Sequence, residues 1–387
     1  MASAPTELHD ELRGRVVMAL ADAEFDWLVV AQPENVGYLT GYRSLSETMR
    51  REPTMVAALD RSGELHLMGP AADAGPVLHD EVVTAERYVA YGRFYFESTS
   101  GAPASRMAGL HPSLRDAGAA LVDRLSHGAT LGIDAAAAAM LAGLVEPDRI
   151  VDASGWMAER RSCKTPAEVR RLERAARLTE GAIDEAIERI APGVTEADLA
   201  RHIAATLAAG GGAPKFVVVT SGERSALADA AATGRAIEPG DLVRFDIGCV
   251  LDGYWADLGR TAVLGRPTEL QRSRYEAIFA GEQAQLDGAR PGVTATELYD
   301  LAVTSVRSHG LVPYRRHHCG HAIGSEVYER PIIASGWDVE LREGMTFCFE
   351  TPFYELGWGG MMVEDTVVIT GEGCRLLNVS DRSLRVL

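Results

Sequence analysis

The sequence predicts a two-domain protein, with an α/β domain over residues 1–155 and an α+β domain with pseudo-twofold symmetry over residues 156–387. A length of 387 residues suits two to three domains of about 150 residues each. Helical and strand-like segments alternate over the first 150 residues, which is typical of an α/β domain with a mixed sheet. A strong helix start then marks a boundary, and two similar segments beyond it indicate an internal repeat.

In the first domain, the spacing of apolar residues predicts a helix, and short apolar runs predict strands. Apolar residues at helical spacing favour a helix over 8–21, and the run 27–31 suits a buried strand. The runs 55–59 and 65–68, separated by the turn residues 61–64, predict a pair of strands.

The domain boundary is predicted just before a helix with a complete N-terminal signal. Thr165 is followed by Pro166 and, three residues after the Thr, by Glu168. This is a capping box with proline at the first helical position. The helix continues through residues 169–190 with apolar residues at roughly helical spacing.

The second domain contains a weak repeat. Residues 192–195 (PGVT) precede Asp198, and residues 291–294 (PGVT) precede Glu297. In both copies a helix ends at Pro-Gly and a new helix begins at a Thr cap with an acid three residues later. Coincidence is one interpretation, but strand-like runs follow both copies, so we favour a duplicated half of helices and sheet.

Composition limits the function and the location. Lys and Arg number 38 against 55 Asp and Glu, a net charge of −17, which repels nucleic acid and anionic lipid. The longest apolar run is residues 135–145, short of the roughly 20 residues of a membrane span. Five unevenly spaced cysteines indicate reduced thiols. We therefore expect a cytoplasmic protein that binds neither nucleic acid nor a membrane.

Two aspartates are predicted to share one face of a hairpin. Asp252-Gly253 separates two strand-like runs and is a strong hairpin signal. That turn places Asp246 opposite Gly259, with Asp257 on the same face at a diagonal distance of roughly 7–8 Å. Like charges so close repel each other, so we expect a cation between them.

The second half of the repeat adds nitrogen and oxygen donors. Residues 315–324 (RRHHCGHAIG) contain three histidines and two glycines. Glu350 ends an otherwise apolar strand predicted over 344–350, and Glu364 interrupts another strand predicted over 361–370. Considered alone, each glutamate is best interpreted as an acid on an edge strand or facing solvent. Four carboxylates and one imidazole together suit a pair of hard to borderline divalent ions, Mn or Co more than a sulfur-rich Zn site.

The ordered set resembles the dinuclear metal site of the pita-bread superfamily, which contains aminopeptidase P, prolidase, methionine aminopeptidase and creatinase. The similar motifs are DIG at 246–248, WADLGRT at 255–261, GHAIG at 320–324, GMTFCFE at 344–350 and VEDT at 363–366. The segment 33–41 (PENVGYLTG) is similar to a creatinase-type N-terminal domain. The resemblance implies a creatinase-like α/β domain before a pita-bread catalytic domain, and a homodimer.

The resemblance also implies roles for the residues. Asp257 and Glu364 bridge two divalent ions, Asp246 holds one ion, and His321 with Glu350 holds the other. Mn is the expected metal, with Co, Zn or Fe as alternatives. The ions activate water and polarise the carbonyl that it attacks, and Glu350 passes the proton to the leaving group.

Two positions depart from the pattern of the family's peptidases. Asp229 lies where a histidine is expected 17 residues before the first metal aspartate, and Tyr328 lies where another is expected seven residues after the metal histidine. Asp229 is interpreted as a base or a binder of a cationic group, and Tyr328 as an oxyanion donor. The alternative is that both are ordinary loop residues. His317 and His318 are further candidates for the pocket wall.

The leading hypothesis is a dinuclear metal hydrolase that cleaves a C–N bond in a small peptide or amide substrate, similar to an Xaa-Pro peptidase. The alternatives are a creatinase-like or ectoine-hydrolase-like amidohydrolase, a lyase acting on a small zwitterion, and a binding-only pseudo-enzyme. For Arg315 and Arg316 we favour an interpretation as partners in surface ion pairs. The alternative is that they bind a substrate carboxylate bidentately.

Overall fold

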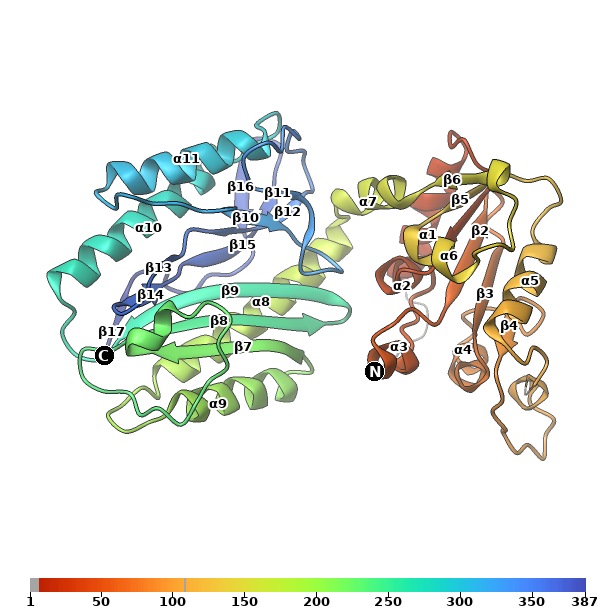
Figure 1. Cartoon of the computed structure of the whole chain (residues 1–387), viewed down its shortest axis with the longest axis horizontal. Helices are drawn as coiled ribbons and strands as arrows, with labels where there is room; N and C mark the ends of the chain where they lie inside the picture. The colour runs from red at the N-terminus through yellow and green to blue at the C-terminus, as the bar shows by residue number, and fades with distance from the viewer. Residues whose placement is uncertain (1–6, 108) are drawn as a thin grey trace. The chain divides into compact units, whose positions relative to one another are not determined.

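The computed structural model describes residues 7–107 and 109–387. The chain forms two compact units, the first ending at Arg160 and the second running from Arg161 to Leu387. The boundary predicted after residue 155 falls near the start of helix α7 (Ser154–Ser162), which crosses this division in sequence. Each unit has its own sheet (Figure 1).

The first unit is an α/β domain around a six-stranded mixed sheet, as predicted. The strand order is β4-β3-β2-β1-β5-β6, with β1 and β2 antiparallel and β1 and β5 parallel. The strands are β1 (Trp27–Val30), β2 (Val56–Asp60), β3 (Leu65–Pro70), β4 (Tyr88–Tyr91), β5 (Leu131–Ile133) and β6 (Ile150–Asp152). The helices are α1 (Glu7–Leu20), α2 (Pro33–Thr40), α3 (Leu45–Arg50), α4 (Ala74–His79), α5 (Leu114–Arg124) and α6 (Ala135–Met140).

The second unit contains a nine-stranded sheet whose main path is β11-β10-β12-β15-β9-β8-β7, with β16 beside β15 and β17 beside β9. Its helices are α8 (Pro166–Ile187), α9 (Glu196–Ala209), α10 (Glu269–Gly288) and α11 (Ala295–Ser308). Its strands are β7 (Ala213–Ser221), β8 (Leu242–Leu251), β9 (Tyr254–Val263), β10 (Gly320–Ala322), β11 (Glu329–Ile332), β12 (Thr346–Glu350), β13 (Phe353–Glu355), β14 (Gly359–Met361), β15 (Glu364–Ile369), β16 (Cys374–Leu376) and β17 (Arg385–Val386).

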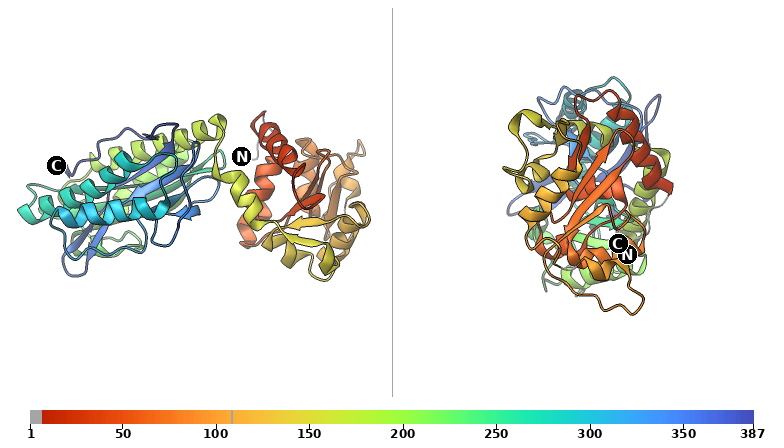
Figure 2. Two further views of the ribbon diagram at one scale, coloured as in Figure 1. Left: turned by 90° about the horizontal axis from the view of Figure 1, so that it is seen from above. Right: turned by 90° about the vertical axis from the view of Figure 1, so that its right-hand side faces the viewer.

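The predicted repeat is visible as two halves with the same order of elements. Helices α8 and α9 precede β7–β9, and helices α10 and α11, which lie side by side, precede the strands of the second half (Figure 1 and Figure 2). The capping boxes predicted at Thr165, Thr195 and Thr294 are all formed. Each satisfies backbone N–H groups that a helix start otherwise leaves unpaired, so these local signals fix where α8, α9 and α11 begin.

The β8–β9 hairpin has the predicted register. Asp252 and Gly253 both have positive φ, 50° and 84°, as the tight two-residue turn of a hairpin requires. Asp246 is paired with Gly259, and Gly248 with Asp257. The turn therefore sets which carboxylates share a face.

The strand predicted over 361–370 is divided in the structure. Residues 359–361 form β14, which pairs with β13 in a separate two-stranded sheet, and β15 begins only at Glu364. The backbone N–H of Gly360 donates to Ser225 Oγ at 2.7 Å, so this segment is bonded to a loop outside the main sheet.

The sheet of the second unit separates an apolar face from a polar one. Phe347 and Phe349 of β12 belong to a buried apolar cluster with residues of α10 and α11. Because side chains alternate along a strand, Cys348 and Glu350 point to the opposite face.

Among the helices of the described residues, none is long and apolar enough to cross a membrane.

Candidate metal centre

Four neighbouring strands bring predicted ligands into one row across the sheet. Glu350 on β12 is paired with Glu364 on β15, Glu364 with Gly259 on β9, and Gly259 with Asp246 on β8. Asp257 lies two residues before Gly259 and therefore on the same face. The hairpin explains the two aspartates, and the pairing of β12 with β15 and of β15 with β9 brings the two glutamates to them.

His321 joins this group from β10. It is the cross-strand partner of Cys348, and its Nε2 lies 3.6 Å from Asp257 Oδ2. Ligand atoms of Asp257, His321, Cys348 and Glu364, all buried, lie within 4.8 Å of one another. The structure thus places three of the five predicted ligands in one compact group.

A glycine leaves the middle of the row open. A Cβ at Gly259 would lie 2.5 Å from Met362 Cγ and 3.1 Å from Glu364 Cβ. Any larger residue at this position would therefore displace Met362 and crowd the Glu364 side chain.

The compact group needs positive charge. Burial raises the pKa of Asp257, and burial together with the charge of Asp257 raises the pKa of Glu364 well above its ordinary value. Asp257 Oδ1 and Glu364 Oε2 are buried and have no hydrogen-bond partner within the described part of the chain. Two unsatisfied carboxylate oxygens beside an imidazole nitrogen are a donor set that fits a divalent ion.

Glu350 has a different environment from these two carboxylates. Its Oε1 lies 2.9 Å from His318 Nδ1, and its Oε2 lies 3.5 Å from the Arg316 guanidinium. Burial opposes its charge, but the hydrogen bond to His318 and the charge of Arg316 overcome burial and lower the pKa of Glu350 to about 2. Glu350 is therefore an ionised carboxylate already paired with protein groups.

Asp246 also has a protein partner. Arg244 Nη1 lies 3.1 Å from Asp246 Oδ2. Burial and the charge of Asp257 nevertheless raise the pKa of Asp246 to about 7. The row therefore contains two carboxylates with cationic neighbours, Asp246 and Glu350, and two carboxylates with unsatisfied oxygens, Asp257 and Glu364.

The other predicted residues are placed unevenly. Tyr328 is about half exposed, at 54%, with its ring centroid 4.0 Å from that of His321. Burial and the nearby carboxylates raise its pKa, so it remains a hydrogen-bond donor. His317 is exposed, with its ring 4.2 Å from that of His318. Asp229 lies exposed in a turn, and no hydrogen bond or ion pair joins it to another described residue.

Cys348 and Arg244 are residues near the centre that the sequence did not single out. Cys348 was detectable, because the alternation along β12 puts it on the same face as Glu350. Its thiol lies 3.5 Å from the Asp257 carbonyl oxygen, and burial raises its pKa well above the ordinary value. Arg244 shares its face with Asp246 two residues later, so the same period of two indicates it.

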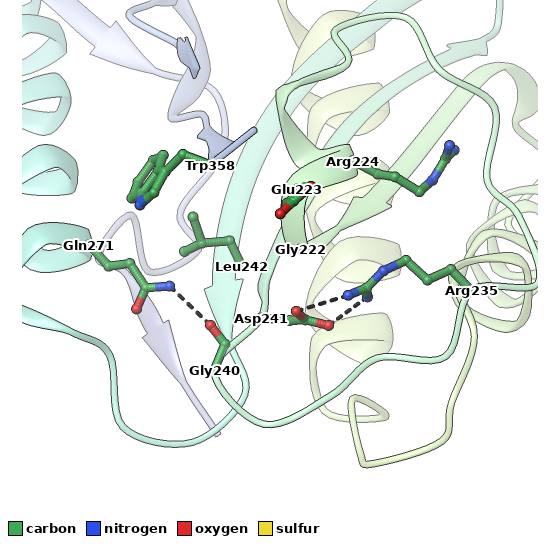
Figure 3. Close-up of a pocket in the computed structure, with 9 residues that line it drawn as sticks. All are labelled: Gly222, Glu223, Arg224, Arg235, Gly240, Asp241, Leu242, Gln271 and Trp358. Atoms are coloured by element: carbon green, nitrogen blue, oxygen red, sulfur yellow. Dashed lines mark hydrogen bonds and ion pairs between the residues drawn. The ribbon is translucent and has the colours of Figure 1, made fainter. Parts of the chain in front are cut away.

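A separate cavity of about 440 Å³ lies beside the start of β8 (Figure 3). Its polar groups are largely paired: Arg235 Nη1 lies 2.6 Å from Asp241, and Gln271 Nε2 donates to the Gly240 carbonyl at 3.0 Å. Arg224 pairs with Glu196 at 3.2 Å. None of the predicted ligands lines it, so it is distinct from the metal centre.

The chain matches two family descriptions. Residues 170–371 match "Metallopeptidase family M24", and residues 13–163 match "Creatinase/Prolidase N-terminal domain". These matches agree with the two units of the fold.

Two sequence relatives of the chain are Xaa-Pro dipeptidases. The Xaa-Pro dipeptidase of Pyrococcus furiosus is 35% identical over 226 residues, 58% of this chain and 65% of that protein. The Xaa-Pro dipeptidase of Lactobacillus delbrueckii subsp. lactis is 34% identical over 252 residues, 64% of this chain and 68% of that protein. The matched stretch thus spans about two thirds of each relative.

Two solved structures are similar over nearly the whole chain. Dipeptidase PepE from Mycobacterium ulcerans has a TM-score of 0.77 and 26% identity, with 98% of each chain covered. Prolidase from Pyrococcus furiosus has a TM-score of 0.73 and 26% identity, covering 95% of this chain and 100% of that one.

Proposed function

Because the chain belongs to metallopeptidase family M24, we propose that it is a metal-dependent hydrolase that cleaves a C–N bond in a small peptide or amide substrate. The observation that carries this proposal is the buried group of Asp257, His321 and Glu364, in which two carboxylate oxygens lack a partner among the described residues. A binding-only protein gains nothing from buried carboxylates that repel one another.

The proposed centre holds two divalent ions, with Mn as the expected metal. Asp246, Asp257, His321, Glu350 and Glu364 would hold the ions. When bound, the ions supply an activated water and polarise the carbonyl of the substrate.

Side chains of the protein transfer the proton and stabilise the oxyanion. Glu350 accepts the proton from the attacking water on a carboxylate oxygen and passes it to the leaving nitrogen. The His318 imidazole, 2.9 Å from Oε1, orients that carboxylate. The Tyr328 phenol, packed beside the His321 ring, donates a hydrogen bond to the developing oxyanion.

For the substrate, the names of the relatives support a peptide with proline at the second position. Tyr328 and Asp229, in place of two expected histidines, support the second candidate, a non-peptidase amidohydrolase or a lyase acting on a small zwitterion. His317 is proposed as part of the pocket wall. Asp229 is proposed to bind a cationic group of the substrate.

The first test compares metal-dependent activity on both substrate classes. We expect the chelated protein to be inactive and Mn to restore cleavage, measured on Xaa-Pro dipeptides, on other dipeptides and on small cyclic amides. Asp257→Ala should remove activity and leave the circular dichroism spectrum unchanged, because it removes a proposed metal ligand. Full turnover in a thoroughly chelated sample would refute the metal-dependent mechanism.

The cytoplasmic location and the homodimer belong to the same proposal. The five cysteines, all free thiols in the structure, support a reducing compartment. The net charge of −17 supports the absence of nucleic acid and membrane partners. Light scattering of the purified protein measures whether it is a dimer.

A further inference from the structure

A cavity of about 300 Å³ in the second unit has two arginines in its wall. Arg315 and Arg316 line it from the segment before β10, and Pro352 and Tyr354 line it from the segment that follows β12. Among the described residues that line the cavity, none is an aspartate or a glutamate. The whole chain has a net charge of −17, so this cavity reverses the sign of the charge locally.

The two arginines do not form the surface ion pairs favoured from the sequence. Arg315 is exposed and makes no hydrogen bond or ion pair to another residue that the structure describes. The Arg316 side chain is only 11% exposed, and its Nη2 lies 3.5 Å from Oε2 of buried Glu350. Its Nε donates to the His318 carbonyl at 3.2 Å, and its Nη1 has no partner in the described chain. Because guanidinium groups stay protonated in proteins, the wall keeps a positive charge that no acid fully balances.

Tyr354 adds a neutral donor beside these charges. The centroid of its ring lies 5.8 Å from the guanidinium carbon of Arg316. Burial raises the pKa of the Tyr354 phenol, so the phenol keeps its proton. Its hydroxyl makes no hydrogen bond to the part of the chain that the structure describes. The adjacent acid, Glu355, is occupied by Arg274 at 2.7 Å, so the hydroxyl remains able to donate.

The carbonyl oxygens around the cavity, in contrast, already accept hydrogen bonds. The Arg316 carbonyl accepts from the Tyr299 hydroxyl at 2.7 Å, and the Tyr314 carbonyl accepts from Arg307 Nη2 at 2.7 Å. The Pro352 carbonyl accepts from the Tyr314 hydroxyl at 3.2 Å. A ligand in the cavity therefore meets donors that still need acceptors. Ionised oxygens are the acceptors that such donors bind most strongly.

We propose that this cavity is an anion-binding site, which takes the carboxylate or phosphate group of a small ligand. Arg315 and Arg316 hold the oxygens of the anion through charge-assisted hydrogen bonds, and the Tyr354 hydroxyl donates a further one. The anion is either a free ion or a group of the substrate. The second source rests on the proposed function, because Arg316 also meets Glu350 of the metal centre.

Equilibrium dialysis with radiolabelled inorganic phosphate tests the site without an activity measurement. The protein is first chelated and dialysed, so that no metal ion binds the phosphate. We expect saturable binding of about one phosphate per chain, weakened by salt because the site is charged. Arg315→Gln removes an exposed charge without breaking a bond to a described residue. It should weaken phosphate binding by about 10-fold or more.

Two further variants isolate the cause. Tyr354→Phe removes only the hydroxyl and should weaken phosphate binding by about 5-fold. Arg290→Gln is the matched control, because it changes the net charge as Arg315→Gln does. Arg290 is exposed and lines another cavity together with Glu297 and Asp300, so phosphate binding should stay the same. Circular dichroism measures whether each variant is folded.

Activity measurements on the Mn-loaded protein identify the source of the anion. Matched peptides that differ in one carboxylate are compared, with a Glu or Gln side chain and with a free or amidated C-terminus. If the anion belongs to the substrate, Arg315→Gln should raise the KM of one carboxylate peptide by about 10-fold and leave the KM of its neutral partner unchanged. If the anion is a free ion, phosphate binds and every KM stays unchanged.

The outcomes separate this inference from the proposed function. Absence of saturable phosphate binding, together with unchanged KM values in Arg315→Gln, overturns the anion site. Equal weakening in Arg315→Gln and Arg290→Gln overturns it too, because net charge alone would then explain the loss. Phosphate that binds only after Mn is added lies on the metal and also overturns the site. Inactivity on every substrate overturns the proposed function, while phosphate binding by the chelated protein still decides the anion site.

Discussion

At the scale of single residues, Asp246 makes the stability of the metal-free chain depend on pH. Burial and the charge of Asp257 raise its pKa from 3.8 to about 7. A carboxyl with a higher pKa in the folded chain than in the unfolded chain stabilises the fold while it is protonated. That contribution is complete below about pH 4 and is lost as the pH rises through about 7. We expect the free energy of unfolding of chelated protein to fall between about pH 5 and about pH 8.

Urea unfolding at these two pH values measures the effect, and Asp246→Asn is the matched variant because it cannot titrate. The variant should lose less stability over the same interval. The opposite shift at Glu350, to a pKa of about 2, gives a contribution that is lost only as the pH falls toward 2, so it stays constant in this window. An equal loss in both proteins would show that Asp246 is not responsible.

The residues that could be predicted from sequence are those fixed by local signals. Asp246 and Asp257 could be placed on one face because Asp252-Gly253 sets the register of the hairpin. The partner of Glu350 could not be chosen among three nearby histidines. His318 meets it because of how the loop before β10 approaches β12, and that approach depends on long-range pairing that no local pattern encodes.

At the scale of elements, β10 holds His321 in place through a glycine. Gly320 has φ +128°, and a Cβ there would lie 2.2 Å from the Cys348 carbonyl oxygen on β12. The clash is with backbone, so β10 would have to move away from β12 and carry His321 with it. We expect Gly320→Ala to destabilise the protein by about 1–3 kcal/mol and to weaken Mn binding.

Gly181→Ala in α8 is the control for this prediction. A Cβ at Gly181 meets no atom within 4 Å, and alanine favours a helix over glycine by up to about 1 kcal/mol. This variant should be as stable as the unmodified protein or more so, with unchanged Mn binding. Chemical unfolding and equilibrium dialysis measure both effects, and normal Mn binding by Gly320→Ala would contradict the role given to the glycine.

Most of the helices and strands could be predicted from the sequence, but the break in the run 361–370 could not. The capping boxes at Thr165, Thr195 and Thr294 are local, so the helix starts follow from a few residues each. The run 361–370 has apolar residues on both sides of Glu364, and it contains neither glycine nor proline to signal a break. The break arises because Gly360 bonds to Ser225, a residue 135 positions earlier in the chain.

At the scale of the whole molecule, the buried carboxylates of the second unit form two groups with opposite effects on stability. Asp365 is bonded by Arg260 and Arg382, each at 2.6 Å. Burial opposes its charge, but these two arginines overcome burial and lower the pKa of Asp365. Asp257 has an unsatisfied oxygen, and burial raises its pKa. Asp365, paired with its two arginines, stabilises the folded chain. The charge of Asp257 destabilises the metal-free chain through electrostatic repulsion, which a bound metal ion would relieve.

This division predicts opposite outcomes for two similar substitutions. Asp257→Asn removes a buried negative charge whose Oδ1 has no partner among the described residues, so the chelated protein should melt about 2–4 °C higher for each 1 kcal/mol of repulsion removed. The same variant should lose the rise in melting temperature that Mn gives the unmodified protein, because ligand binding to the folded state is what produces that rise. Asp365→Asn takes the carboxylate away from Arg260 and leaves Arg382 with Glu282 alone, so it should destabilise the protein by about 3–5 kcal/mol. Differential scanning calorimetry with and without Mn measures all three values. A lower melting temperature for chelated Asp257→Asn would mean that the charge of Asp257 supports the fold, and that its burial serves structure before metal binding.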